Sequence, residues 1–150
     1  MKRYDPTPPW ETYEVILREA DGTLSEGGVR PFSQKLADHG DPITTALGKM
    51  WLVGFHGWHK ARLHLVDHIG KPLIVRADSK EPEIWILKCK PSCWRLYFHV
   101  YQDSKRIVYL YAKCKKKNAQ DAADAARART VLNGLRPGGS GIIAFEFPAP

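Results

Sequence analysis

The chain has 150 residues, of which 43% are hydrophobic and 26% are charged, and its formal net charge at pH 7 is +7. This length and composition favour one globular domain with its own core, and they exclude a disordered or fibrous chain. The most apolar window, Met50 to Trp58, is too short and too rich in glycine to cross a bilayer. We therefore expect a single cytoplasmic domain over residues 1–150 with no membrane partner.

The first part of the chain predicts an arm, a strand and a helix. Residues 1–10 contain three prolines and are expected to form an irregular arm. Residues 12–18 alternate in hydrophobicity and precede an Asp-Gly turn, which is typical of a strand. A helix is expected from Pro31 to Gly40, because proline suits a first helical turn and Phe32 and Leu36 share a face.

A second helical region starts at Asp41-Pro42, where apolar residues begin to recur every three or four positions. Glycines 48, 54 and 57 are expected to divide it into two helices, the second from Trp58 to His68. Only His64 and His68 have the spacing that puts two ligands on one helical face, and no carboxylate motif accompanies them. The sequence therefore predicts partner-facing or solvent-facing histidines, with no metal and no cofactor.

The three cysteines are Cys89, Cys93 and Cys114. An odd number in a chain expected in a reducing compartment favours free thiols. A zinc site would need a fourth ligand such as His99, and the spacing of Cys89 and Cys93 is a weak signal for one.

Residues 84–117 form a basic block of three expected strands, at 84–90, 94–101 and 106–113. The block holds nine lysines and arginines against one acid, Asp103, so its net charge of +8 exceeds that of the whole chain. A short strand before it, at Leu73 to Arg76, is also possible on pattern. A positive field confined to one block indicates a polyanionic partner, and nucleic acid fits best.

Alternation predicts which side chains of the block face outward, because successive strand residues point to opposite faces. Inward residues are expected to be Trp94, Leu96, Phe98, Val100, Val108, Leu110 and Ala112. Outward residues are expected to be Arg95, Tyr97, His99, Tyr101, Ile107, Tyr109, Tyr111 and Lys113, with Lys88 and Lys90 on the preceding strand. Tyrosines stack on unpaired bases and cations hold phosphates, so this face predicts a single-stranded nucleic-acid surface, the alternative being an ordinary half-solvated sheet.

After the block, residues 118–133 predict a helix that begins with Asn118 as its cap and ends at Asn133-Gly134. Residues 136–150 are expected to form a flexible tail. Its apolar run, Ile142 to Phe147, could add an edge strand or dock on a partner. The whole pattern predicts an α+β fold with an N-terminal strand and helices, an antiparallel sheet of about four strands and a C-terminal helix.

The runs EIWILK, WRLYF and RIVYLYAKCKKK, followed by an alanine-rich helix that ends in arginines, resemble the RelE/HigB-like toxins of bacterial and phage toxin–antitoxin modules. Element order is similar over about residues 11–135 and motifs over residues 83–133. The resemblance implies a RelE-like fold and a phage-derived, HigB-like, metal-independent endoribonuclease that cleaves mRNA, often on the ribosome. It also implies a cognate antitoxin protein as a partner.

The resemblance also implies roles for single residues. Arg95 matches the family's strand arginine, and Lys115 and Lys116 match its paired lysines. Tyr111 stands where the family has histidine, and Lys113 where it has phenylalanine. The candidate catalytic residues are Arg95, His99, Tyr111 and Lys113; the candidate RNA-binding residues are Lys88, Lys90, Tyr97, Tyr109, Lys115, Lys116 and Lys117.

Cleavage needs cations around the phosphorane, a base for the 2′-hydroxyl and an acid for the leaving oxygen. His99, Tyr111 and a lysine of lowered pKa remain open for the proton transfers. The alternative function is a non-catalytic nucleic-acid binder, or a phage protein that inhibits a host protein, on the same scaffold.

Overall fold

The computed structural model describes residues 10–16, 32, 42–78, 80–89, 94–114, 120–135 and 141–144. Nine elements lie in this part of the chain: β1 (Glu11–Ile16), α2 (Pro42–His56), α3 (Trp58–His64), β2 (Ile74–Asp78), β3 (Glu81–Lys88), β4 (Trp94–Tyr101), β5 (Arg106–Cys114), α4 (Gln120–Asn133) and β6 (Gly141–Ala144). The expected α+β class is confirmed. None of the helices in these ranges is long and apolar enough to cross a membrane.

The strands form one mixed sheet in the order β2-β3-β4-β5-β1-β6. Hairpin pairing makes β2 to β5 antiparallel, whereas β1 runs parallel to β5 and β6 runs antiparallel to β1. The sheet thus has six strands where about four antiparallel ones were expected. The two additions are the edge strands: β2, and β6 within the tail that was expected to be flexible.

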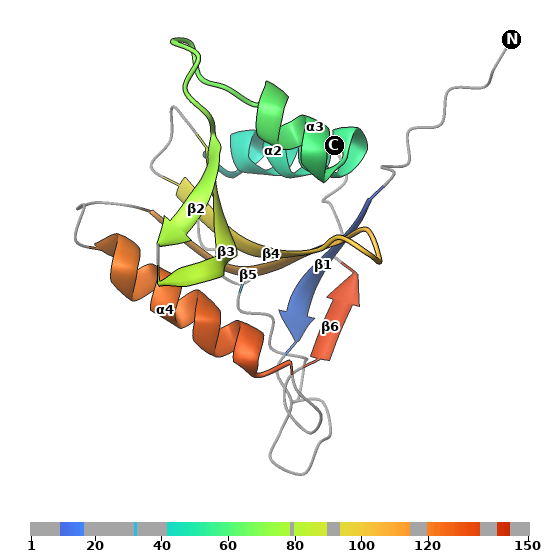
Figure 1. The fold of residues 1–150 in the computed structure, drawn as a ribbon, viewed down its shortest axis with the longest axis vertical. Coiled ribbons are helices and arrows are strands. Elements are labelled where there is room, and N and C mark those ends of the chain that lie inside the picture. Colours follow the sequence, from blue (N-terminus) through green and yellow to red (C-terminus); the bar gives the residue numbers. More distant parts are fainter. Residues whose placement is uncertain are drawn as a thin grey trace, which may run out of the picture.

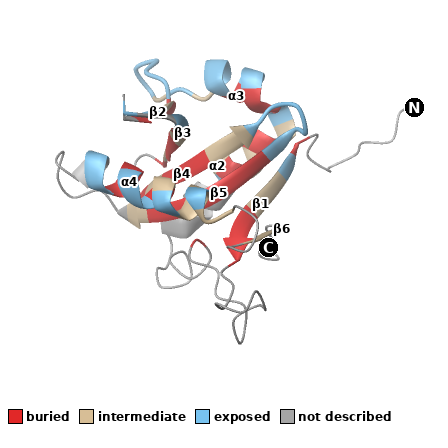
Figure 2. Ribbon diagram, turned by 60° about the horizontal axis from the view of Figure 1, so that its bottom comes forward, coloured by how far each residue is buried: buried red, intermediate tan, exposed pale blue. Residues whose placement is uncertain are grey.

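Helices cover both faces of this sheet (Figure 1). Helices α2 and α3 lie on one face, where a core cluster includes Met50, Trp58, Leu96 and Phe98. Helix α4 lies on the other face and contributes Ala125 and Ala128 to a second cluster, which includes Ile84, Tyr97, Val108 and Leu110. Figure 2 shows β4 and β5 buried between α2 and α4, with the outer side of α4 exposed. The central strands therefore have no face that is open to solvent along its whole length.

Gly57 separates α2 from α3, while Gly48 and Gly54 are accommodated within α2. Gly57 has a φ of +82°, and a Cβ there would come 2.8 Å from the indole nitrogen of Trp10. Both the backbone angle and the close indole require glycine at this position. The second helix ends at His64, four residues earlier than expected, because Leu65 adopts an extended conformation.

A β-bulge in β5 changes the alternation of the basic block. Tyr97 is opposite Tyr111, but the next residue, Phe98, is opposite Tyr109, so Leu110 is an extra residue. Residues 107–110 therefore lie on the face opposite to the one that strict alternation predicts, because Ile107 and Tyr109 join the α2/α3 core and Val108 and Leu110 lie under α4. Ala112 and Tyr111 lie on the faces that were expected, with Leu96 and with Tyr97.

Some expectations fall on residues that the structure does not describe. The N-terminal arm lies outside the described residues up to position 9, and so does the expected helix at 31–40, apart from Phe32. Lys90, Lys115, Lys116 and Lys117 also lie outside them.

Candidate nucleic-acid interface

Three basic side chains stand side by side at one end of the sheet. Lys88 of β3 is directly opposite Arg95 of β4, and Arg95 is directly opposite Lys113 of β5. All three point to the α4 face: Lys88 alternates with Ile84 and Ile86, Arg95 with Tyr97, and Lys113 contacts α4 itself. Directly opposite residues lie about 5 Å apart at Cβ, and like charges in such pairs are destabilising. We call these three residues the basic row.

The carboxylate of Asp124 on helix α4 contacts the basic row. The Lys113 Nζ lies 3.4 Å from Oδ1 of Asp124, a residue that is itself buried. The guanidinium of Arg95 donates to the main-chain oxygen of the adjacent Trp94 at 3.1 Å. Each member of the row is half-buried, so the row combines partial shielding from water with an excess of positive charge. That combination suits an anionic ligand.

Tyr111 adjoins the basic row, because it lies two residues before Lys113 on the same face. Its hydroxyl accepts a hydrogen bond from Nη1 of Arg127 at 3.1 Å. This bond raises the pKa of the Arg127 guanidinium. Since the arginine occupies a lone pair of the hydroxyl oxygen, the hydroxyl proton is still available to another acceptor.

The expected outward tyrosine surface is wrong, because Tyr97, Tyr109 and Tyr111 are all buried. Tyr97 and Tyr111 lie under α4, and the bulge leaves Tyr109 on the α2/α3 face, stacked on Phe32 with ring centroids 5.0 Å apart. Burial raises the pKa of the Tyr109 hydroxyl. In this conformation none of the three rings can stack on a base, so nucleic acid would have to be held through its phosphates.

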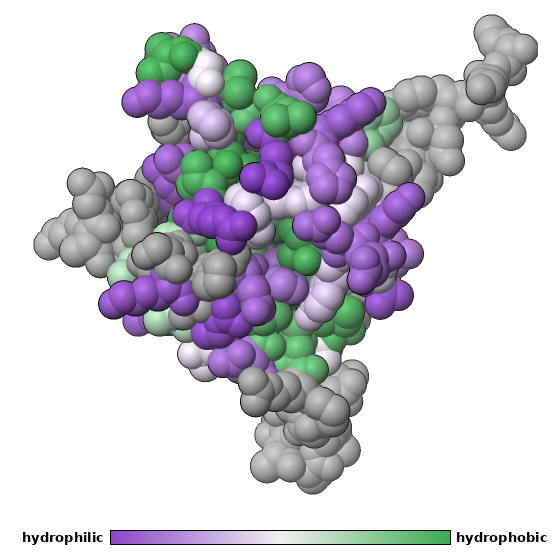
Figure 3. Space-filling model, viewed as in Figure 1, coloured by the Kyte–Doolittle hydropathy of each residue, from purple (hydrophilic) through white to green (hydrophobic). Residues whose placement is uncertain are grey.

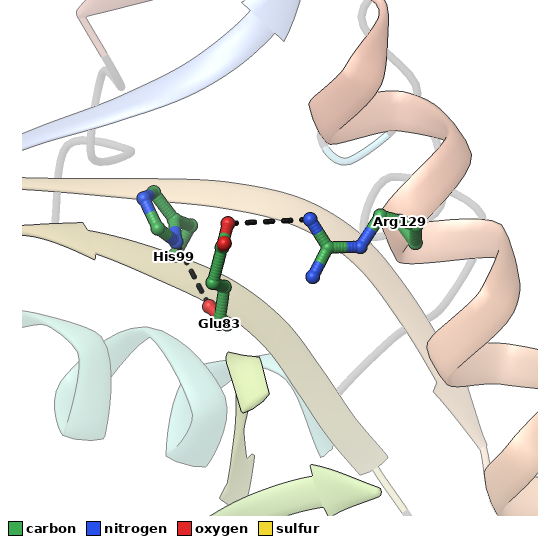
Figure 4. A network of polar contacts seen from close by, with 3 residues as sticks. All are labelled: Glu83, His99 and Arg129. Carbon is green, nitrogen blue, oxygen red and sulfur yellow. Dashed lines mark hydrogen bonds and ion pairs between the residues drawn. The ribbon is translucent and has the colours of Figure 1, made fainter. Parts of the chain in front are cut away.

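His99 lies at the other end of β4 from the basic row. Its Nδ1 is 2.8 Å from the main-chain oxygen of Glu83 (Figure 4). A carbonyl oxygen only accepts, so Nδ1 carries the proton in this contact and Nε2 is the free position. His99 lies four positions after Arg95 along β4, which corresponds to about 13 Å in an extended strand. The structure therefore brings Arg95, Tyr111 and Lys113 together and leaves His99 apart.

The carboxylate of Glu83, close to His99, forms an ion pair with helix α4. Oε2 of Glu83 lies 3.2 Å from Nη1 of Arg129, and Figure 4 shows the carboxylate between His99 and Arg129. The His99 ring also packs edge-on against Tyr101, with centroids 4.6 Å apart. His99 is thus part of a structural link between β3, β4 and α4.

In the described residues, His64 and His68 are exposed and Cys89 is buried, and they do not come together as a metal site. His64 is the last residue of α3 and His68 lies in a turn, so the helical face that would pair them does not form. Cys89 is a buried free thiol, and burial raises its pKa to about 12. Cys93 lies outside the described residues. Within the described ranges, no group of three or more His, Cys, Asp and Glu side chains could hold a metal ion.

Two residues of this interface were not singled out from the sequence: Asp124 and Arg127. They are three positions apart on α4, a spacing that puts both side chains on neighbouring positions of one helical face. The spacing of Asp124 and Arg127 can be read from the sequence, but the strand residues that they contact cannot. No protein-family model and no curated protein matches this chain.

Proposed function

We propose that the chain binds single-stranded RNA through the basic row and cleaves it without a metal ion, as a toxin of the RelE/HigB kind. The observation that carries the proposal is the register Lys88–Arg95–Lys113, which sets three cations side by side across three strands. Like charges in such a row are destabilising, the Asp124 carboxylate pairs with Lys113, and a phosphodiester backbone offers further anions in series. The sequence resemblance to the toxin family supports the same assignment, with mRNA as substrate and a neutralising antitoxin as partner.

Arg95 is the central cation and is proposed to hold the scissile phosphate. Its planar guanidinium can donate two parallel hydrogen bonds to the non-bridging oxygens, whereas Lys88 and Lys113 act as point charges on either side. In the reaction the 2′-hydroxyl gives its proton to solvent and its oxygen forms a bond to phosphorus, while the bond from phosphorus to the 5′-oxygen breaks. Positive charge placed before the reaction stabilises the phosphorane that forms between these steps.

Tyr111 is the proposed proton donor to the leaving 5′-oxygen. It lies beside Lys113, and the hydrogen bond from Arg127 puts a cation on the hydroxyl oxygen, which stabilises the phenolate left after transfer. The products are a 2′,3′-cyclic phosphate and a 5′-hydroxyl. His99 is about 13 Å from Arg95 along the strand and is assigned no part in this step.

Binding without cleavage is the second candidate function. The burial of Tyr97 and Tyr111 under α4 favours it, because a buried hydroxyl has less access to a bound strand. Both candidates use the basic row to hold phosphate, and they differ only in whether the RNA is cut.

The test is single-turnover incubation of the full chain with a 5′-labelled RNA in EDTA, with and without ribosomes, followed by analysis of the 3′ ends of the labelled products. We expect cyclic phosphate ends, and slow growth on expression that recovers when the adjacent partner gene is co-expressed. Intact RNA that is nevertheless bound, with an affinity that falls linearly on a log–log salt plot, would establish the binding function instead. No affinity for RNA at low salt would refute both.

A further inference from the structure

A second surface of the molecule is defined by exposed aliphatic side chains. Four large hydrophobic residues are exposed in the described part of the chain, and three of them lie between positions 63 and 69: Leu63 is 75% exposed, Val66 44% and Ile69 63%. Figure 3 shows hydrophobic side chains at the tip of the loop that joins α3 to β2 and over α3, among hydrophilic ones. Single exposed hydrophobic residues are ordinary, but three in one short segment indicate an interaction site.

The loop that carries these residues is held in shape. Oδ1 of Asp67 accepts hydrogen bonds from the amides of Ile69 and Lys71, both at 2.9 Å, and the Asp67 amide donates to the Lys71 carbonyl at 2.9 Å. Val66 and Pro72 form a bridge across its base. Ile69 is therefore presented to solvent by a closed turn and is not exposed through fraying of a helix end.

Cations frame this segment on the same side of the sheet. The guanidinium carbons of Arg62 on α3 and Arg76 on β2 lie 4.6 and 4.7 Å from the ring centroid of Trp85, and both arginines are exposed. For Arg62, stacking on the indoles of Trp58 and Trp85 fixes the plane of the guanidinium, whose N–H groups can donate to oxygen acceptors. Exposed Lys60 and Lys71 add to the positive charge.

We propose that α3, the loop to β2 and strand β2 form a docking surface for an acidic protein segment that carries aliphatic or aromatic anchor residues. Its carboxylates would pair with Arg62 and with the exposed Lys60 and Lys71, and its anchors would cover Leu63 and Ile69. The charge decides against a second copy of this chain, because self-association would oppose like cations. Aliphatic side chains offer no ring for a base, which decides against RNA.

The position of β2 decides between a protein and a lipid surface. Among the described strands β2 is at the edge of the sheet, so the backbone groups along its outer side can pair with an added strand. Lipid offers no such partner. This surface is on the α2/α3 side and does not include the basic row, so the inference stands independently of RNA cleavage.

The test is a differential selection from a random peptide display library, with the full chain as bait and the variant Leu63→Ser/Ile69→Ser as counter-bait. We expect enriched peptides that are acidic and carry apolar residues. As soluble peptides they should bind the parent at least about tenfold more tightly than either this variant or Arg62→Gln. Tyr101→Ser, which removes the fourth exposed hydrophobic residue, should bind like the parent. The melting temperature of Leu63→Ser/Ile69→Ser should match the parent's, because both residues are exposed. Arg62→Gln loses its stacking on Trp85 and Tyr101→Ser its packing on His99, so circular dichroism checks that these two variants are folded.

Other outcomes overturn the proposal. They are no enrichment of the parent over the counter-bait, enriched peptides without acidic residues, or peptides that bind all variants equally. Two further arms identify a different occupant. Binding of the parent to phosphatidylserine-containing vesicles that the double variant loses, in the absence of peptide enrichment, would assign the surface to a membrane. Dimerisation of the parent in sedimentation experiments that Leu63→Ser/Ile69→Ser abolishes would assign it to a second copy.

Discussion

The two ends of strand β4 differ in how their charged residues are paired. Near His99, cations are matched with acids: Arg129 pairs with Glu83, and Arg106 is directly opposite Glu11 across β5 and β1. Near Arg95, three cations are opposite one another, and the carboxylate of Asp124 pairs with one of them, Lys113. Pairing like charges costs folding free energy, whereas pairing opposite charges is neutral or favourable. The contrast fits our proposal that the Arg95 end holds a ligand, whereas the contacts at the His99 end join elements of the fold.

The largest expected effect is on catalysis. If Arg95 holds the scissile phosphate, Arg95→Ala should slow single-turnover cleavage about a hundredfold, which corresponds to roughly 3 kcal/mol of transition-state stabilisation. Arg95→Lys should recover little of this, because an ammonium lacks the planar fork. His99→Ala is the matched control at the other end of the strand and should keep the parent rate. If His99→Ala slowed cleavage more than Arg95→Ala, the catalytic site would lie at the His99 end of β4 instead.

Tyr111→Phe tests whether Tyr111, near Arg95, donates the proton in cleavage. It should lower the cleavage rate about tenfold or more, within the range of a general acid, while RNA affinity stays at the parent value. Equilibrium binding and single-turnover rates measured on the same preparation separate the two. A variant that cleaves like the parent would remove Tyr111 from proton transfer.

The next effect concerns affinity and its salt dependence. Lys88→Gln and Lys113→Gln should each weaken RNA binding severalfold at low salt and lower the slope of the log–log salt plot by about 1. Lys60→Gln on α3 is the control, since Lys60 is exposed on the other side of the sheet. Titration by fluorescence anisotropy at four or more salt concentrations measures both quantities. An equal change in slope for all three lysines would mean that binding is not confined to the row.

Substitution of Asp124 should strengthen RNA binding, whereas substitution of Lys88 or Lys113 should weaken it. Its carboxylate competes with phosphate for Lys113, so Asp124→Asn should tighten RNA binding by about fourfold, the Coulomb energy of one charge at about 5 Å in water. The same change should reduce stability, because it removes the partner of Lys113. Asp103→Asn, in the exposed turn between β4 and β5, should leave affinity unchanged. Weaker binding by Asp124→Asn would show that the carboxylate positions the row.

The smallest effect is on stability. Arg95→Gln should raise the free energy of unfolding by about 0.5 kcal/mol by removing like-charge contacts. Glu83→Gln should lower it by about 0.3 kcal/mol, because it breaks a partly exposed ion pair. Urea denaturation at low and high salt measures both, and both changes should shrink as salt screens them. Shifts of the same sign in the two variants would contradict the contrast between the two ends.

Local sequence pattern predicted where the helices and strands lie better than it predicted which strands pair with each other. The segments at 94–101 and 106–113 alternate and are bounded by turns, and they correspond closely to β4 and β5. The pairing of β1 with β5 joins residues that are some ninety positions apart in the sequence, and no local signal specifies it. The α+β class follows from the elements, whereas the order of strands in the sheet depends on long-range contacts.

The candidate site was predicted in part for a similar reason. Arg95 and Lys88 were correctly placed on one face because strict alternation holds in β3 and β4. The error at Ile107 and Tyr109, which were expected to face outward, comes from the extra residue at Leu110, which alternation cannot foresee. The burial of Tyr97 has another cause: α4 covers the face that was expected to be open. A tyrosine-rich face fits a solvated sheet and a buried one equally well.

The place of β1 in the sheet sets a constraint on how the chain is made. Both neighbours of β1 are synthesised after it, β5 near the end of the chain and β6 later still. Until then the apolar side chains of Val15 and Ile16 have no strand beside them, although both are buried in the finished fold. Such long-range pairing slows folding and leaves an unpaired strand available to other chains. Expression yield should therefore depend on chaperones, and truncation before β6 should promote aggregation by uncovering one edge of β1.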